Sequence, residues 1–137
     1  MRPNKEEYYL EIASVVLKRG TCLHRNYGAV IVQNDQIVAT GYTGSPRGDI
    51  NCCDRGVCER EHLNVAPGER YELCKSVHAE MNAIIAAGRN KTMGADLYIV
   101  GRDMKTGAIT GTLPCLLCSR IIRNAGIANV YVKEKED

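Results

Sequence analysis

The sequence contains no phenylalanine and no tryptophan, although 45% of its 137 residues are hydrophobic. Its core must therefore be built from aliphatic side chains and alanine, with seven tyrosines as the aromatic residues. Charged residues make up 25% of the chain, an ordinary value for a globular protein that excludes a disordered one. A chain of 137 residues suits one domain, so we expect a single domain over residues 1–137.

Long hydrophobic runs and a strong charge of either sign are also missing. The longest apolar run, Ala83–Ala87, is far too short to span a membrane. A net charge of +2 does not favour general binding to a polyanion, so nucleic acid is not an expected partner. The segment Met1–Glu7 has no apolar core of a signal peptide. We therefore expect a cytoplasmic protein with no membrane partner.

Local hydrophobic spacing predicts helices and short strands in an order typical of a layered α/β domain. The expected elements are a helix over 5–18, strands over 29–32 and 37–40, a helix over 77–87, strands over 96–100 and 108–110, a helix over 114–124 and a strand over 130–132. We expect Asn34 and Asp35 to form a hairpin turn between the first two strands. Ser76 should cap the second helix, and Pro114 should lie in the first turn of the third. The second helix should bury Val77, Met81, Ile84 and Ile85.

Residues 41–75 differ from the rest because they are rich in glycine, proline, cysteine and charge and show no periodicity. A structureless segment of this length is unusual inside a compact domain. A bound metal or ligand would account for it, and the alternative is a floppy insertion. In a cytoplasmic protein, clustered cysteines more often bind metal or do chemistry than form disulfides.

The strongest chemical signal is His78-Ala79-Glu80 followed by Pro114-Cys115-Leu116-Leu117-Cys118, each at the start of a predicted helix. Cys115 and Cys118 should point the same way, and the positive end of the helix favours their thiolate forms. With His78 they provide three zinc ligands and leave a fourth position for water. Glu80 is then placed to carry protons.

Each half of this pattern has a simpler interpretation when it is taken alone. A histidine at a helix start is often a cap, and a C-x-x-C pair can be redox-active. The combination of H-x-E with P-C-x-x-C is the signature of zinc-dependent nucleobase deaminases. We therefore interpret the pair of motifs as one catalytic zinc site.

The chain resembles the cytidine deaminase superfamily, and within it the deoxycytidylate (dCMP) deaminases. The residues that carry the resemblance are Thr21-Cys22, 27–32, Gly41-Tyr42-Thr43-Gly44-Ser45-Pro46-Arg47-Gly48, Asn51-Cys52, 68–74, 78–85 and 114–118. The resemblance implies a three-layer α/β/α fold with a mixed sheet of four to five strands flanked by helices. It also implies a homo-oligomer, often a hexamer, that dCTP activates and dTTP inhibits.

The resemblance implies hydrolysis of dCMP to dUMP and ammonia, which supplies dUMP for thymidylate synthesis. Water activated by the zinc attacks C4 of cytosine, while Glu80 passes protons to ring N3 and to the leaving amine. The alternatives are a deaminase of another cytosine or purine compound, and a non-catalytic zinc-binding module. An intact Glu80 argues against the module, which has no use for that carboxylate.

Substrate contacts are expected at Thr43, Arg47 and Ala79. Many relatives have asparagine where this chain has Thr43, and a hydroxyl cannot match the geometry of an amide. Arg47 is a candidate for the phosphate, because a nucleotide monophosphate needs several donors. The other candidates for the phosphate are Arg70, Arg25 and Lys75.

A second, structural zinc is expected on Cys22, Cys52, Cys58 and Cys74, since four thiolates form a closed tetrahedral site. Some dCMP deaminases are similar in holding a second zinc here. His62 is an alternative ligand, and Cys53 is left over. The simpler alternative is that these are buried free thiols.

Overall fold

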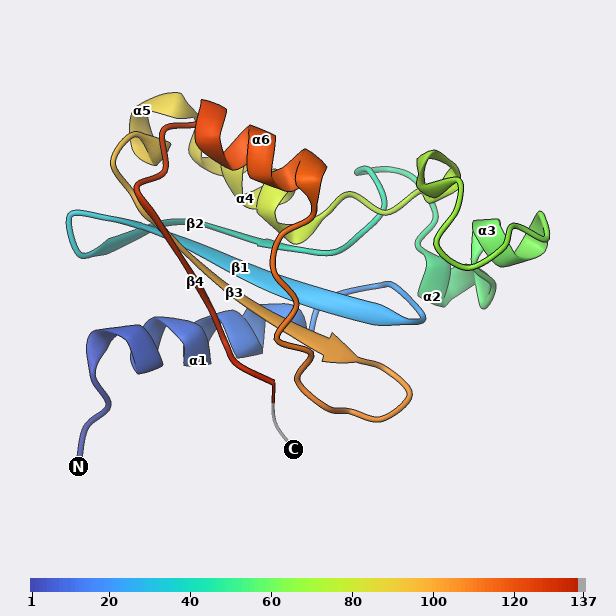
Figure 1. Cartoon of the computed structure of the whole chain (residues 1–137), viewed down its shortest axis with the longest axis horizontal. Coiled ribbons are helices and arrows are strands. Elements are labelled where there is room, and N and C mark those ends of the chain that lie inside the picture. Colours follow the sequence, from blue (N-terminus) through green and yellow to red (C-terminus); the bar gives the residue numbers. More distant parts are fainter. Residues whose placement is uncertain (136–137) are drawn as a thin grey trace.

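The computed structural model describes residues 1–135 and centres on a four-stranded mixed sheet (Figure 1). The strands lie in the order β2-β1-β3-β4. β1 (Arg25–Gln33) pairs antiparallel with both β2 (Gln36–Tyr42) and β3 (Asp96–Asp103). β3 pairs parallel with β4 (Asn129–Val132), so the sheet is mixed, as expected.

Helices cover both faces of this sheet, which gives three layers. α1 (Lys5–Leu17) lies on one face, and α4 (Ala79–Ala87) and α6 (Leu116–Asn124) lie side by side on the other (Figure 1). The short helix α5 (Arg89–Thr92) follows α4 directly. The expected α/β/α fold is confirmed. Within residues 1–135, no helix is both long and apolar enough to cross a membrane.

The core has two halves because successive residues of β1 point to opposite faces. Ala29 and Ile31 pack toward α4 and α6, whereas Val30 and Val32 pack toward α1. The two buried tyrosines, Tyr9 and Tyr98, lie in the α1 half. There the ring of Tyr98 packs between those of Tyr9 and Tyr131, with centroids 5.1 and 4.9 Å apart. These tyrosines provide the aromatic bulk that phenylalanine and tryptophan supply in the cores of other proteins.

The predicted first helix and hairpin are confirmed, and each has a clear local cause. Asn4 caps α1, with its side-chain oxygen accepting a hydrogen bond from the Glu7 N–H at 2.8 Å. Asn34 and Asp35 have positive φ angles of 53° and 58°, which fit the tight turn between β1 and β2. Both strands are longer than their apolar cores suggested.

Three local predictions are wrong. Ser76 does not cap α4, because the backbone of the adjacent Val77 pairs with Gly44 and holds this segment extended, so that His78 occupies the N-cap position. Pro114 lies before the α6 N-cap, which is Cys115. The expected strand over 108–110 is a single bridge between Ile109 and Arg102.

The predicted buried stripe of α4 is only partly correct. Met81 and Ile84 are half-buried against the core, whereas Val77 lies before the helix. Ile85 is 75% exposed, and the residues buried on this helix are Ala79, Glu80 and Ala83. The cause is a close approach of α4 to β2 at Gly41, where an added Cβ would overlap backbone atoms of Ala79 and Ala83. Only small residues fit in such a contact. A similar close approach occurs between α1 and β1 at Gly28, where an added Cβ would overlap backbone atoms of Ala13 and Leu17.

The segment 41–75 contains short helical turns and is not a floppy insertion. These turns are α2 (Cys52–Arg55), α3 (Glu59–His62) and a 3₁₀ turn, η1 (Tyr71–Leu73). Arg60 fastens the segment to itself, since its guanidinium donates to the Glu69 carbonyl at 2.7 Å and lies over the ring of Tyr71. Hydrophobic periodicity did not predict these turns, because each has only three or four residues and the segment is rich in glycine and proline.

The close approach at Gly41 predicts a large effect for a small substitution. Gly41→Ala should lower the free energy of unfolding by about 1–3 kcal/mol, the usual cost of overpacking a core. Gly44→Ala is the matched control, because an added Cβ there would meet no atom closer than Thr21 Oγ1 at 3.5 Å. Urea unfolding of both variants measures the difference. Equal stabilities would contradict the described packing of α4.

Candidate metal centre and active site

Three of the predicted ligands converge on one point between the starts of α4 and α6. The Nδ1 atom of His78 lies 3.2 Å from the Cys118 Sγ and 3.6 Å from the Cys115 Sγ. The three ligand atoms all lie within 4.8 Å of one another. The geometry thus selects Nδ1 as the ligand nitrogen, which the sequence does not specify.

Local structure explains this convergence. His78 and Cys115 each occupy an N-cap position with extended backbone, so their side chains leave the ends of two neighbouring helices. The Cys115 sulfur also accepts a hydrogen bond from the Cys118 N–H at 3.4 Å, which fixes the two cysteines on one side of the first turn of α6.

The donor set fits a zinc ion. With bond lengths of about 2.0–2.1 Å to nitrogen and 2.3 Å to sulfur, tetrahedral ligands lie about 3.6 Å apart. The distances from the His78 nitrogen to the two sulfurs are close to that value. One nitrogen and two sulfurs are also the ligands of a catalytic site that keeps its fourth position open.

Glu80 lies beside these ligands in the first turn of α4 and is 5% exposed. Burial raises the pKa of the Cys118 thiol well above its usual value, and the charge of Glu80 adds to this rise. The expected effect of the helix end on the Cys118 thiol is therefore outweighed by burial. A metal cation at this point would favour the thiolate again.

Two residues predicted to contact the substrate, Thr43 and Ala79, are largely buried. Thr43 is 6% exposed, and its hydroxyl oxygen accepts a hydrogen bond from the Tyr27 N–H at 3.0 Å. Ala79 is fully buried, so only its backbone could meet a ligand. Its N–H belongs to the first turn of α4, where no partner exists within the helix.

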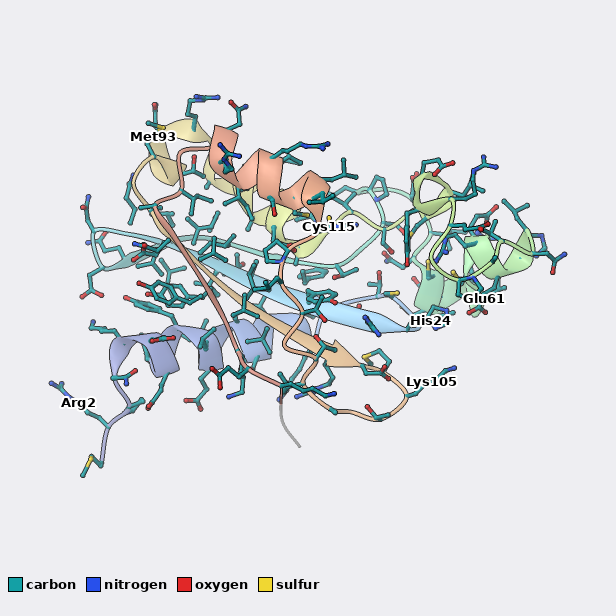
Figure 2. All side chains as sticks on the ribbon, viewed as in Figure 1. Arg2, His24, Glu61, Met93, Lys105 and Cys115 are labelled. Carbon is teal, nitrogen blue, oxygen red and sulfur yellow. The ribbon has the colours of Figure 1, made fainter. Side chains whose placement is uncertain are left out.

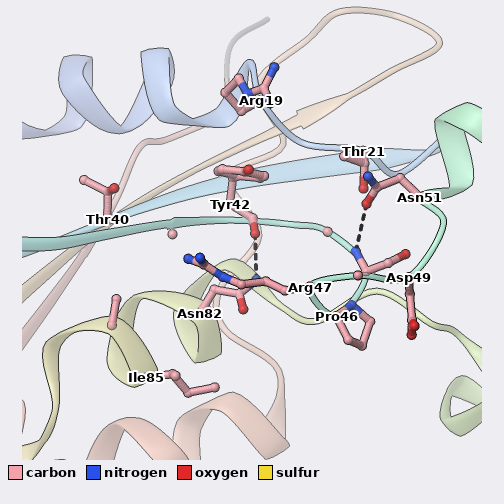
Figure 3. A pocket seen from close by; sticks show the side chains of 15 residues that line it. Arg19, Thr21, Thr40, Tyr42, Pro46, Arg47, Asp49, Asn51, Asn82 and Ile85 are labelled. Carbon is pink, nitrogen blue, oxygen red and sulfur yellow. Dashed lines mark hydrogen bonds between the residues drawn. The ribbon is translucent and has the colours of Figure 1, made fainter.

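Arg47 lines a cleft of about 570 Å³ between the 41–51 segment and α4 (Figure 3). Arg19, which no sequence motif singles out, lines the same cleft. Thr21 and Ser45 also line it, but their hydroxyl oxygens are buried and have no hydrogen-bond partner among residues 1–135. The zinc ligands and Glu80 do not line it, so this cleft is distinct from the metal centre.

The other basic candidates lie outside that cleft. Arg70 is exposed and forms an ion pair with Glu72 in the 41–75 segment. Arg25 lies at the exposed start of β1. Lys75 and His62 lie near Glu59, whose pKa is lowered chiefly by Arg55 and further by these two groups.

The remaining cysteines gather around Cys52. Burial raises the pKa of the Cys52 thiol, and Cys22, Cys74 and Cys58 are close enough to add to the rise. Cys53 is exposed.

The tightest group in this region contains only one of those four cysteines. Cys58 lies with His24 and Glu61, three ligand atoms within 4.8 Å of one another, and the His24 Nε2 is 2.5 Å from the Glu61 carboxylate. Figure 2 shows His24 and Glu61 at the α2–α3 end of the molecule, away from Cys115. From sequence, His24 is expected to be a surface residue and not a ligand, although it lies only two residues after Cys22.

Comparison with known proteins agrees with this arrangement. Residues 3–134 match the family model described as the cytidine and deoxycytidylate deaminase zinc-binding region. The chain belongs to this family. The resemblance that the two motifs indicated is therefore confirmed.

Relatives in this family include deoxycytidylate deaminases from yeasts and phages. The chain is 38% identical to the enzyme of Schizosaccharomyces pombe over 94% of its length and 36% identical to that of Saccharomyces cerevisiae over 98%. It spans only 37% and 39% of those two relatives. It is 34% identical to the deoxycytidylate deaminase of Mycobacterium phage D29, with 97% of this chain and 98% of that relative covered.

Solved structures show the same fold. The dCMP deaminase of cyanophage S-TIM5, solved in complex with dCMP and dUMP, has a TM-score of 0.68 and 27% identity. The alignment covers 98% of this chain and 84% of that one. A cytidine deaminase from Mycobacterium tuberculosis has a TM-score of 0.53 at 13% identity, and this similarity concerns the fold alone.

Proposed function

We propose that this chain is a zinc-dependent hydrolase that converts dCMP to dUMP and ammonia, providing dUMP for thymidylate synthesis. The observation that carries the proposal is the convergence of His78 Nδ1, Cys115 Sγ and Cys118 Sγ beside the buried Glu80. The relatives from phage D29 and S-TIM5, which match over most of their own lengths, support dCMP as the substrate. The proposal treats residues 1–137 as one deaminase domain.

A zinc ion bound at this centre would supply a Lewis acid that activates water at neutral pH. The remaining work falls to the chain itself. Glu80 is held in the first turn of α4, where its carboxylate can accept one proton from water and deliver it to ring N3. It can then carry a second proton, taken from the hydroxyl added at C4, to the leaving amine. Its burial keeps bulk water from competing for that proton.

Two alternatives remain: a different cytosine or purine substrate, and a non-catalytic zinc module. The intact Glu80 beside the ligands favours an enzyme. Arg19 and Arg47 in the cleft favour a ligand that carries phosphate.

Ammonia release from a panel of nucleobases, nucleosides and nucleotides tests this activity. We expect release from dCMP, and a rate at least about 100-fold lower for Glu80→Gln, because the amide cannot transfer protons. Glu11→Gln, an exposed change on α1 across the sheet, is the control and should leave the rate unchanged. Turnover of another compound but not dCMP would overturn the substrate. An unchanged rate in Glu80→Gln would overturn the role of Glu80.

We also propose a second, structural zinc in the 41–75 segment, with Cys22, Cys52, Cys58 and Cys74 as its first candidate ligands. The closeness of the other three cysteines to Cys52 supports this proposal. The group of His24, Cys58 and Glu61 supplies further ligand atoms in the same region, so the final set can combine both. Two thiolate zinc sites require reduced cysteines, which supports the proposed cytoplasmic location.

Elemental analysis of reduced, purified protein tests the number of zinc ions. We expect two per chain, one lost in Cys118→Ser and the other lost in Cys52→Ser. Cys53→Ser is the control, because Cys53 is exposed and belongs to neither group. A single zinc that Cys52→Ser does not affect would leave only the catalytic ion.

We further propose a homo-oligomer, with a hexamer as the expected form, that responds to dCTP as an activator and dTTP as an inhibitor. The cleft lined by Arg19 and Arg47 is the candidate place for nucleotide phosphates, either of the substrate or of an effector. The guanidinium groups of Arg19 and Arg47 support a phosphate-bearing ligand there.

Steady-state kinetics distinguish these two uses of the cleft. We expect a sigmoidal response to dCMP that dCTP makes hyperbolic. Loss of the dCTP effect in Arg47→Ala, with KM unchanged, would assign the cleft to the effector, whereas a raised KM would assign it to the substrate. Arg70→Ala is the control, since Arg70 lies outside the cleft. A hyperbolic response indifferent to dTTP would contradict regulation.

A further inference from the structure

Asn82 connects three parts of the backbone around the metal centre. Its side-chain amide donates to the Tyr42 carbonyl at 2.9 Å and, more weakly, to the Val77 carbonyl at 3.4 Å. Its backbone N–H donates to the His78 carbonyl at 3.0 Å. One residue on α4 therefore holds both the end of β2 and the two residues that enter the helix. Figure 3 shows the amide of Asn82 directed at Tyr42.

A second set of bonds acts on the same segment. The Val77 N–H donates to the Gly44 carbonyl at 2.6 Å, and the Gly44 N–H donates to the Val77 carbonyl at 3.2 Å. His78 follows directly, is exposed, and makes no side-chain capping bond. The position of its ring therefore depends on how firmly the backbone before it is held.

We propose that Asn82 is a positioning residue that fixes His78 as a metal ligand and Glu80 as the acid–base group. The part that concerns catalysis rests on the proposed deaminase function. Asn82 lines the 41–51 cleft, whereas the ligands and Glu80 do not, and both acceptors of its amide are backbone carbonyls, so its effect on the metal centre passes through the backbone.

The chemistry of the side chain explains why an amide is needed. Both of its partners are carbonyl oxygens, so the residue must donate. An ionised aspartate of the same shape would place oxygen against oxygen. Alanine would keep the helix but leave the Tyr42 carbonyl without this donor.

Zinc affinity provides a readout that does not depend on turnover. We expect Asn82→Asp and Asn82→Ala to bind zinc at the His78 centre about 10-fold or more weakly, the usual effect of losing a group that orients a metal ligand. Competition with a chromophoric chelator measures this, in a Cys52→Ser background so that the proposed second site does not contribute. The visible spectrum of the cobalt-substituted protein should also change, because it reports ligand geometry.

Steady-state kinetics at saturating zinc distinguish an effect on the positions of His78 and Glu80, which lowers kcat, from an effect on dCMP binding, which raises KM. We expect kcat for dCMP to fall about 10-fold while KM stays within roughly 3-fold. Asn90→Asp is the matched control, since Asn90 lies exposed on α5 and undergoes the same change of charge. It should leave zinc affinity, spectrum and kcat unaltered.

Two results would overturn the proposal. A lower melting temperature with unchanged zinc affinity and kcat would make Asn82 a purely structural residue. A raised KM with unchanged kcat would make it a ligand contact in the cleft. If the wild-type protein releases no ammonia from dCMP, the proposed function fails, while zinc affinity and the cobalt spectrum still decide the role of Asn82.

Discussion

The backbone of α4 packs directly against β2, with no side chain between them at Gly41. This contact fixes the height and direction of the helix above the sheet. Because His78 and Glu80 lie at the start of that helix, the contact also fixes where the metal ligand and the proton carrier lie. The small residues Ala79 and Ala83 and the exposed Ile85 follow from the same constraint.

The ligands of the metal centre come from the starts of two neighbouring helices, α4 and α6. Cys118 is fully buried, and burial opposes ionisation of its thiol. A buried thiolate is costly unless a positive charge compensates it, and zinc provides that charge. We therefore expect the centre to contribute to the stability of the α4–α6 layer as well as to chemistry.

The sequence predicted the parts of this protein that depend on local patterns. Asn34 and Asp35 marked their turn, and the spacing of Cys115 and Cys118 placed both sulfurs on one side of α6. The buried side of α4 could not be predicted in this way, because apolarity favoured Ile85 and only the contact with Gly41 excludes it. His24 and Arg19 were missed because distant segments bring them to their sites. The N-cap of α4 was predicted at Ser76 and lies at His78, because local sequence does not reveal the backbone hydrogen bonds between Gly44 and Val77.

Crystal diffraction measured at the zinc absorption edge tests the central claim most directly. The account predicts a zinc ion bound by His78 Nδ1, Cys115 Sγ and Cys118 Sγ, with a fourth ligand that does not come from the protein. A zinc ion bound through the other nitrogen of His78, or closed by Glu80 as a fourth protein ligand, would contradict it.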